Sequence, residues 1–275
     1  MLQAHAVVAA TLIVIGVNWI ANAWPLNGRS TGELSALYPN PFTPAGYVFG
    51  IWGLIYAGTL GYAAWQWYCA RRGDRRLVPL AAPYLVACAA NVCWIVLWHW
   101  LQVGASLFAM VGLLAALAVA WQRVRRIAPA GPVERVLVHG TSSLYLGWIC
   151  VATFANLAAW LVASGLRPFG LSLASLAIVF VLAAALLFVA LVWRTRWLVP
   201  GLVYVWAAIG IARRAGQPEA VVTAAWIGAA IVLAALAWTA AQRLRTFRDP
   251  ATPTRADGTH SPRASAATRG RAARS

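Results

Sequence analysis

The sequence predicts an all-α fold, a polytopic bundle of transmembrane helices. Of its 275 residues, 62% are hydrophobic and only 10% are charged, a balance that cannot supply a soluble globule with a polar surface. Apolar runs near the length of about 20 residues that a spanning helix needs recur along the chain. Because lipid offers no partner to free backbone amides, and no run alternates as the strands of a membrane barrel do, we expect helices throughout.

Eight apolar runs are the predicted spans, and most of the 16 tryptophans lie in them. The seventh run is short, so a re-entrant segment is an alternative to a full crossing there. The runs cover residues 4–24, 44–68, 77–101, 105–122, 137–163, 171–193, 197–212 and 219–242.

Arginine supplies all 22 basic residues, and its placement predicts the orientation of the chain. With eight spans, 18 arginines fall on one side and four on the other. The positive-inside rule then places both termini in the cytoplasm. Arg213 and Arg214 fall on the opposite side, which keeps a seven-span arrangement open. We prefer eight spans because seven would export the basic end of the chain.

The net charge of +16 predicts contact with membrane lipid rather than with nucleic acid. Arginines beside membrane helices act as topology signals and bind anionic head groups. Ala21-Asn22-Ala23 resembles a signal-peptide cleavage site, but no basic residue precedes the apolar run, so we expect an uncleaved first helix. Residues 246–275 have almost no large apolar side chains, which predicts a disordered basic cytoplasmic tail.

Few residues of the spans are suited to catalysis or metal binding. No Asp or Glu lies in the interior of a span, which argues against a proton-coupled pump. His99 is a conceivable haem ligand, but its neighbours Trp98 and Trp100 favour an interfacial aromatic belt. The four cysteines follow no metal or disulfide spacing. We therefore assign no catalytic residue and no metal site.

Two asparagines stand out because an amide in hydrocarbon is costly unless it is paired. Asn91 shares a helix face with Trp94, and Asn156 lies four residues before Trp160. Each asparagine faces either another helix, as an interhelical hydrogen bond, or a cavity. Both interpretations stay open.

Two tryptophans, Trp52 and Trp148, lie well inside their runs rather than at the ends, where the interfacial belt is expected. Together with Tyr56 and Asn91 they could bind a flat, amphipathic molecule by stacking and a few hydrogen bonds.

Three sequence patches, in order, resemble the TspO/MBR family, the tryptophan-rich sensory proteins related to the mitochondrial translocator protein. The run from Phe42 to Tyr56 resembles the signature that opens the second helix of that family. Asn91 and Trp94 match an N-x-x-W in the third helix. The fifth-helix pattern is matched by Tyr145, Leu146, Trp148, Ala152, Phe154, Asn156 and Trp160.

The resemblance covers about residues 1–165 and implies a five-helix core with a pocket under its first loop, where porphyrins and other flat hydrophobic ligands bind. By this resemblance, the ligand-binding residues are Trp52, Tyr56, Asn91, Trp94, Trp148, Ala152 and Asn156. The lid residues are Tyr38, Pro39, Phe42 and Pro44. No cofactor is required, and a porphyrin or haem-like molecule is the implied ligand.

The chain departs from the family pattern in the lid. Glu33-Leu34 replaces a Trp-Tyr pair, Ala45 replaces a proline, Phe42 replaces a tryptophan, and Leu144 replaces the proline before Tyr145. We therefore expect a different lid closure and leave the identity of the ligand open.

Residues 166–245 add about three helices beyond the five-helix core, as in a long bacterial form of the family. These helices replace a dimer contact, cover one face or add a partner site, and a homodimer stays an alternative. The expected function is a multi-pass sensor or carrier in a bacterial cell membrane. The alternatives are a transporter of small hydrophobic metabolites, a light- and oxygen-dependent porphyrin-degrading enzyme, and an aromatic-rich scaffold.

Overall fold

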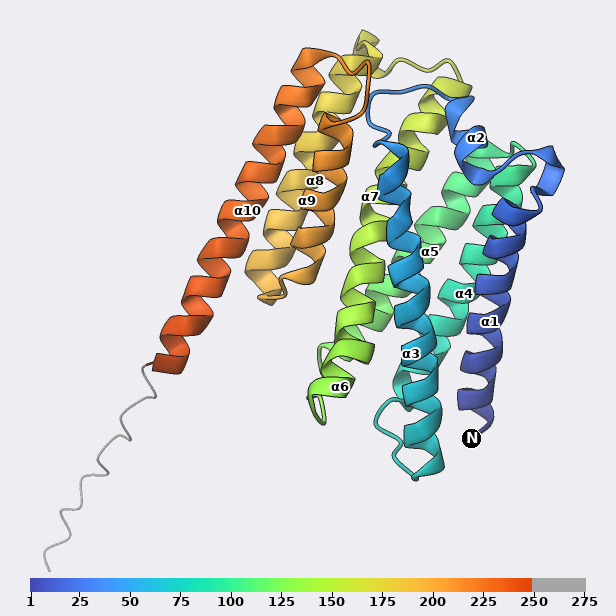
Figure 1. The fold of residues 1–275 in the computed structure, drawn as a ribbon, viewed down its shortest axis with the longest axis vertical. Helices are drawn as coiled ribbons and strands as arrows, with labels where there is room; N and C mark the ends of the chain where they lie inside the picture. Colours follow the sequence, from blue (N-terminus) through green and yellow to red (C-terminus); the bar gives the residue numbers. More distant parts are fainter. Residues whose placement is uncertain (249–275) are drawn as a thin grey trace, which may run out of the picture.

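The computed structural model describes residues 1–248, and all regular structure in that range is helical (Figure 1). The predicted fold class, a polytopic helical bundle, is confirmed. The long helices are α1 (Leu2–Ala23), α3 (Ile51–Arg71), α4 (Val78–His99), α5 (Val103–Val124), α7 (Thr141–Ala163), α8 (Leu173–Thr195), α9 (Val199–Ala212) and α10 (Glu219–Arg248).

Short helical turns lie in the connections and at the helix ends. The connection between α1 and α3 contains η1 (Leu26–Gly28), α2 (Thr31–Ala36) and η2 (Gly46–Gly50). A turn α6 (Pro132–Glu134) and a π-helical turn η3 (Arg135–Gly140) lead into α7, and η4 (Pro168–Gly170) precedes α8.

Seven helices within the described residues are long and apolar enough to cross a membrane. The exception among the expected spans is α9, whose 14 residues extend about 21 Å, less than the hydrocarbon thickness of about 30 Å. It is nevertheless one continuous helix, antiparallel to α8 and α10 (Figure 1). The start of α1 and the end of α10 lie at the same end of the bundle, as the eight-span arrangement predicts.

The helices after residue 165 share a hydrophobic core with the preceding five. Gly147 on α7 allows a close approach of α9, because a Cβ there would lie 3.2 Å from the Cα of Pro200. Trp148 and Val203 belong to one buried cluster. Tyr204 joins α9 to α8 by donating a hydrogen bond to the Val181 carbonyl at 2.9 Å. Helices α8–α10 are thus packed against the bundle rather than tethered beside it.

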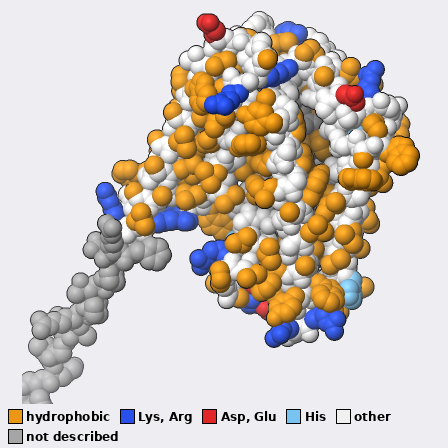
Figure 2. Space-filling view, viewed as in Figure 1, with side chains coloured by type: hydrophobic (Ala, Val, Ile, Leu, Met, Phe, Trp, Pro, Cys, Tyr) orange, Lys and Arg blue, Asp and Glu red, His pale blue; other side chains and the backbone are white. Residues whose placement is uncertain are grey.

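Charged side chains gather at the ends of the bundle, with hydrophobic ones between them (Figure 2). At the end that holds the start of α1, Arg76 pairs with Asp74 at 2.7 Å and with the buried Glu134 at 3.1 Å. Trp65 donates a further hydrogen bond to Glu134. The hydrogen bonds from the backbone and guanidinium of Arg76 hold the pKa of Asp74 below its usual value. This network ties together the loops that follow α3 and α5.

The last helix overlaps the first residues of the predicted tail. Helix α10 continues through Arg248. The rest of the predicted tail, residues 249–275, lies outside the described residues.

Candidate ligand-binding cavity

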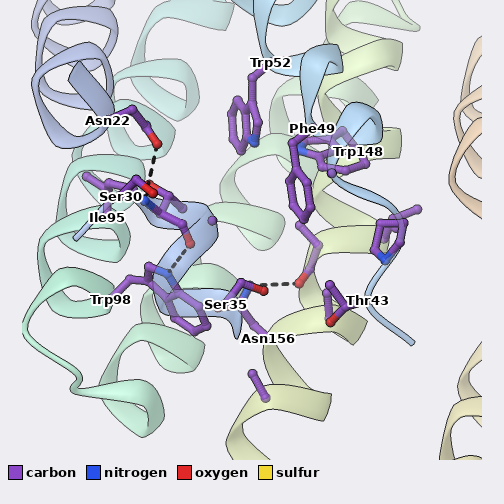
Figure 3. A pocket seen from close by; sticks show the side chains of 18 of the residues that line it. Asn22, Ser30, Ser35, Thr43, Phe49, Trp52, Ile95, Trp98, Trp148 and Asn156 are labelled. Atoms are coloured by element: carbon purple, nitrogen blue, oxygen red, sulfur yellow. Dashed lines mark hydrogen bonds between the residues drawn. The ribbon is translucent and has the colours of Figure 1, made fainter. Parts of the chain in front are cut away.

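A cavity of about 580 Å³ lies between α1, α3, α4 and α7, beneath α2. Its volume falls within the range of about 300–1,000 Å³ typical of small-molecule sites. The molecule is hollowed on this face between α1 and α3, beside α2 (Figure 2). In Figure 3, Asn22, Ser30 and Trp98 lie on one side of the cavity, and Phe49 and Trp148 lie on the other.

Aromatic rings form the largest part of the wall. The ring of Trp52 is nearly parallel to that of Trp94, with centroids 6.1 Å apart and 18° between the planes. It also stacks on Tyr56 at 5.5 Å and meets Trp148 edge-on at 6.3 Å. Offset and edge-to-face arrangements are those that aromatic quadrupoles favour. The wall therefore presents π surface to the cavity.

The indole N–H of Trp148 is a buried donor with no hydrogen-bond partner among residues 1–248. Its side chain is 2% exposed and lines the cavity. An unpaired buried donor costs about 1–3 kcal/mol, so such groups are expected to meet a ligand or an ordered water.

The two predicted asparagines have different environments. Asn156 lines the cavity, and its Oδ1 accepts a hydrogen bond from the indole N–H of Trp94 at 3.0 Å, which orients that ring. Asn91 is fully buried and does not line the cavity. It accepts from Asn18 at 2.8 Å and donates to the hydroxyl of Tyr145 at 3.0 Å. Asn91 therefore joins α1, α4 and α7, which is the interhelical alternative for this residue.

The cavity is covered by the connection between α1 and α3, residues 24–50, which we call the lid. Ser30 caps α2 and forms a capping box with Glu33, so that the short helix keeps its N-terminal amides paired. His99, at the end of α4, holds the first half of the lid. Its Nδ1 donates to the Leu26 carbonyl at 2.9 Å, and its Nε2 lies 3.1 Å from the Thr31 hydroxyl.

In the described conformation the ring of His99 is hydrogen-bonded to the lid through both nitrogens. A carbonyl can only accept, so Nδ1 carries a proton and donates to Leu26, while Nε2 pairs with the hydroxyl of Thr31. Both ring nitrogens are occupied. Nor does any group of three or more metal-binding side chains occur among residues 1–248.

The second half of the lid is held by α9 and by the connection from α9 to α10. Four hydrogen-bonded residues of that segment each contact the lid backbone between residues 40 and 48. The backbone carbonyl of Gly210 accepts from the Ala45 N–H at 3.0 Å; Trp206 donates to the Val48 carbonyl at 3.1 Å, Gln217 to Pro41 at 2.7 Å, and Arg214 to Asn40 at 2.7 Å and to Thr43 at 3.0 Å.

The four predicted lid residues have separate positions. Only Pro44 lines the cavity. Tyr38 packs edge-on against Trp98, with ring centroids 6.0 Å apart, and Pro39 is exposed. Phe42 is 2% exposed and lies in a cluster with residues of α7–α10, so it anchors the lid to the additional helices rather than facing the cavity.

The family sequence model of TSPO-like proteins matches residues 4–238. This chain belongs to the TSPO-like protein family. No curated protein and no solved structure matches it. The family resemblance predicted from three motifs is thereby confirmed. The match also extends beyond residue 165 into α10, so this TSPO-like chain carries its family signal across the additional helices as well.

Six of the seven predicted ligand-binding residues of this TSPO-like protein come together around the cavity, and Asn91 is the exception. They are Trp52, Tyr56, Trp94, Trp148, Ala152 and Asn156. Other lining residues were missed by the sequence reasoning, including Asn18, Asn22, Ser30, Ser35, Thr43, Phe49, Trp98 and Arg214.

A sequence signal existed for some of the missed residues. Asn22 follows Asn18 by four positions, and Trp98 follows Trp94 by four, so each pair shares one helix face. The sequence marked Arg214 only as one of the few arginines on its side of the membrane, and nothing local placed it at the cavity, because the α9–α10 connection is distant in sequence from the other lining residues.

Proposed function

We propose that this TSPO-like protein is an integral membrane sensor or carrier that binds porphyrin-like or other flat hydrophobic molecules in the cavity beneath the lid. The observation that carries the proposal is the aromatic wall of Trp52, Trp94 and Tyr56 beside the unpaired indole N–H of Trp148. An aromatic surface with an unpaired donor beside it suits a planar ring system that has an acceptor atom.

The residues around the cavity favour binding over hydrolysis or proton transfer. No His, Cys, Asp or Glu lines the cavity as described. General acid–base or nucleophilic catalysis relies on such side chains placed within reach of the substrate. Light-dependent oxidation of a bound porphyrin would rest on the same tryptophans and is the enzymatic alternative that the test below separates.

The cellular placement belongs to the same proposal. The arginine-rich end of the bundle carries the start of α1 and the end of α10. By the positive-inside rule this end faces the cytoplasm of a bacterial cell, and the lid and cavity mouth face the opposite side of the cell membrane.

The test is a titration of detergent-purified protein with protoporphyrin IX in the dark, followed by tryptophan quenching. We expect saturable binding that weakens about tenfold or more in a Trp52→Phe, Trp148→Phe double variant. Each substitution removes aromatic area and an indole N–H, and the second removes the buried, unpaired N–H of Trp148. The matched control removes two exposed tryptophans away from the cavity, Trp193→Phe and Trp238→Phe.

Three results would separate the alternatives. Equal affinity in both double variants, or no saturable binding by the folded protein, would refute the assignment of the cavity. Loss of the porphyrin under illumination would favour the enzyme. Movement of the porphyrin between the compartments of a proteoliposome would favour the transporter.

A further inference from the structure

One charged side chain lines the cavity as described, and it comes from the additional helices. Arg214 lies in the connection between α9 and α10 and reaches the rim beside Thr43 and Pro44. The remaining lining residues are uncharged. The electrostatic character of the cavity mouth therefore depends on this guanidinium.

The charge of Arg214 is held in place without being neutralised. Its Nη1 donates to the backbone carbonyls of Asn40 at 2.7 Å and Thr43 at 3.0 Å. The ion pairs found among residues 1–248 belong to Arg76, so no carboxylate balances Arg214 within that range. Its Nε and Nη2 donors have no protein partner there. A fixed cation with unused donors remains at the rim.

The other residues around the cavity opening are also compatible with an anionic group. The lid contributes the hydroxyl-bearing residues Ser30, Thr31, Ser35 and Thr43 to the cavity lining, whereas α3, α4 and α7 contribute mainly aromatic and small apolar ones. The cavity is thus amphipathic, with polar groups on the lid, on α1 (Asn18, Asn22) and on α7 (Asn156). With no acidic residue in the lining, an anion at the lid meets attraction and no like charge.

We propose that Arg214 binds a carboxylate of the ligand, so that the cavity takes flat apolar molecules that carry an acidic group on one edge. A guanidinium offers parallel N–H donors that match the two oxygens of a carboxylate, and such a pair strengthens where water is partly excluded. This inference rests on the proposed function, because it concerns the occupant of the same cavity. It also gives α9 and α10 a role in selecting the ligand.

The test compares protoporphyrin IX with its dimethyl ester, which keeps the ring and removes both acidic groups. Dark titrations are made with the wild type, with Arg214→Gln and with Arg213→Gln. Arg213 is the matched control, because it is the adjacent residue, is exposed and does not line the cavity. Partitioning of the two ligands into detergent cancels when the same ligand is compared across variants.

We expect Arg214→Gln to weaken binding of the acid about tenfold or more, which is the range of a hydrogen bond to a charged group. Binding of the ester should change less than twofold, and Arg213→Gln should resemble the wild type with both ligands. The ratio of the wild-type affinity for protoporphyrin IX to that of Arg214→Gln should also decrease as the salt concentration is raised.

Equal weakening of acid and ester in Arg214→Gln would show that Arg214 only holds the lid, and would overturn the inference. Unchanged affinity for the acid would overturn it as well, while leaving the proposed function intact. If neither ligand binds saturably to the folded wild type, both the inference and the proposed function fail.

Discussion

Substituting Gly210 with alanine tests whether α9 sets the position of the lid. A Cβ at this residue would overlap Cγ2 of Val48 and lie 3.2 Å from Cβ of Pro44. Val48 is fully buried, and the Gly210 carbonyl accepts a hydrogen bond from the Ala45 N–H. Because the branched side chain has no free space and the backbones are joined, the added methyl must push α9 and the lid apart.

The expected size follows from two opposing contributions. Overpacking of this kind costs about 1–3 kcal/mol, whereas replacing glycine by alanine within a helix returns up to about 1 kcal/mol. We therefore expect Gly210→Ala to lower the free energy of unfolding by about 1–2 kcal/mol. Val48→Ala alone should cost about 2 kcal/mol, because it removes buried methyl groups.

The double variant separates the steric explanation from others. Val48→Ala removes the atom that the new methyl would overlap, so Gly210→Ala should then cost nothing further, and the coupling energy should be about 1–2 kcal/mol. The assay is reversible unfolding in mixed micelles with increasing SDS. Gly112→Ala is the control, since a Cβ at that position of α5 meets no atom within 4 Å. Additive effects of the two substitutions, within about 0.5 kcal/mol, would refute the reasoning.

Three further predictions concern the lid and the bundle. Hydrogen bonds from Ser30 hold the pKa of Glu33 below its usual value of 4.5. The ionised Glu33 therefore stabilises α2 fully above pH 4.5, and this stabilisation is lost as the pH falls through the lowered pKa. Amide protection in α2 should fall in acid for the wild type, and in Glu33→Ala it should be low both in acid and at neutral pH. Asn91→Leu should destabilise the protein by about 1–3 kcal/mol, because its two partners lose a hydrogen bond, yet leave porphyrin affinity unchanged in the quenching titration. His99→Phe should speed hydrogen exchange in residues 26–36 without changing exchange in the middle of α4.

Much of the fold and part of the cavity could be predicted because they depend on patterns within single segments of the sequence. Apolar runs of sufficient length must be helical in lipid, whatever packs beside them. Trp52 and Tyr56, or Ala152 and Asn156, lie four residues apart and so share a helix face, which makes their common placement predictable once that face is known. The alternation of arginine-rich loops likewise predicted that both ends of the described chain lie at one end of the bundle.

Tertiary structure decided which face of each helix meets which neighbour. Asn91 and Trp94 lie close together on one helix, but only Trp94 lines the cavity, because Asn91 pairs with α1 and α7. Phe42 turns toward α7–α10 instead of the cavity, and Arg214 reaches the lid from 171 residues further along the chain. These contacts depend on the rotation and close approach of helices that are distant in sequence. Helical periodicity along one segment determines which residues share a face, but only packing between segments determines where that face points.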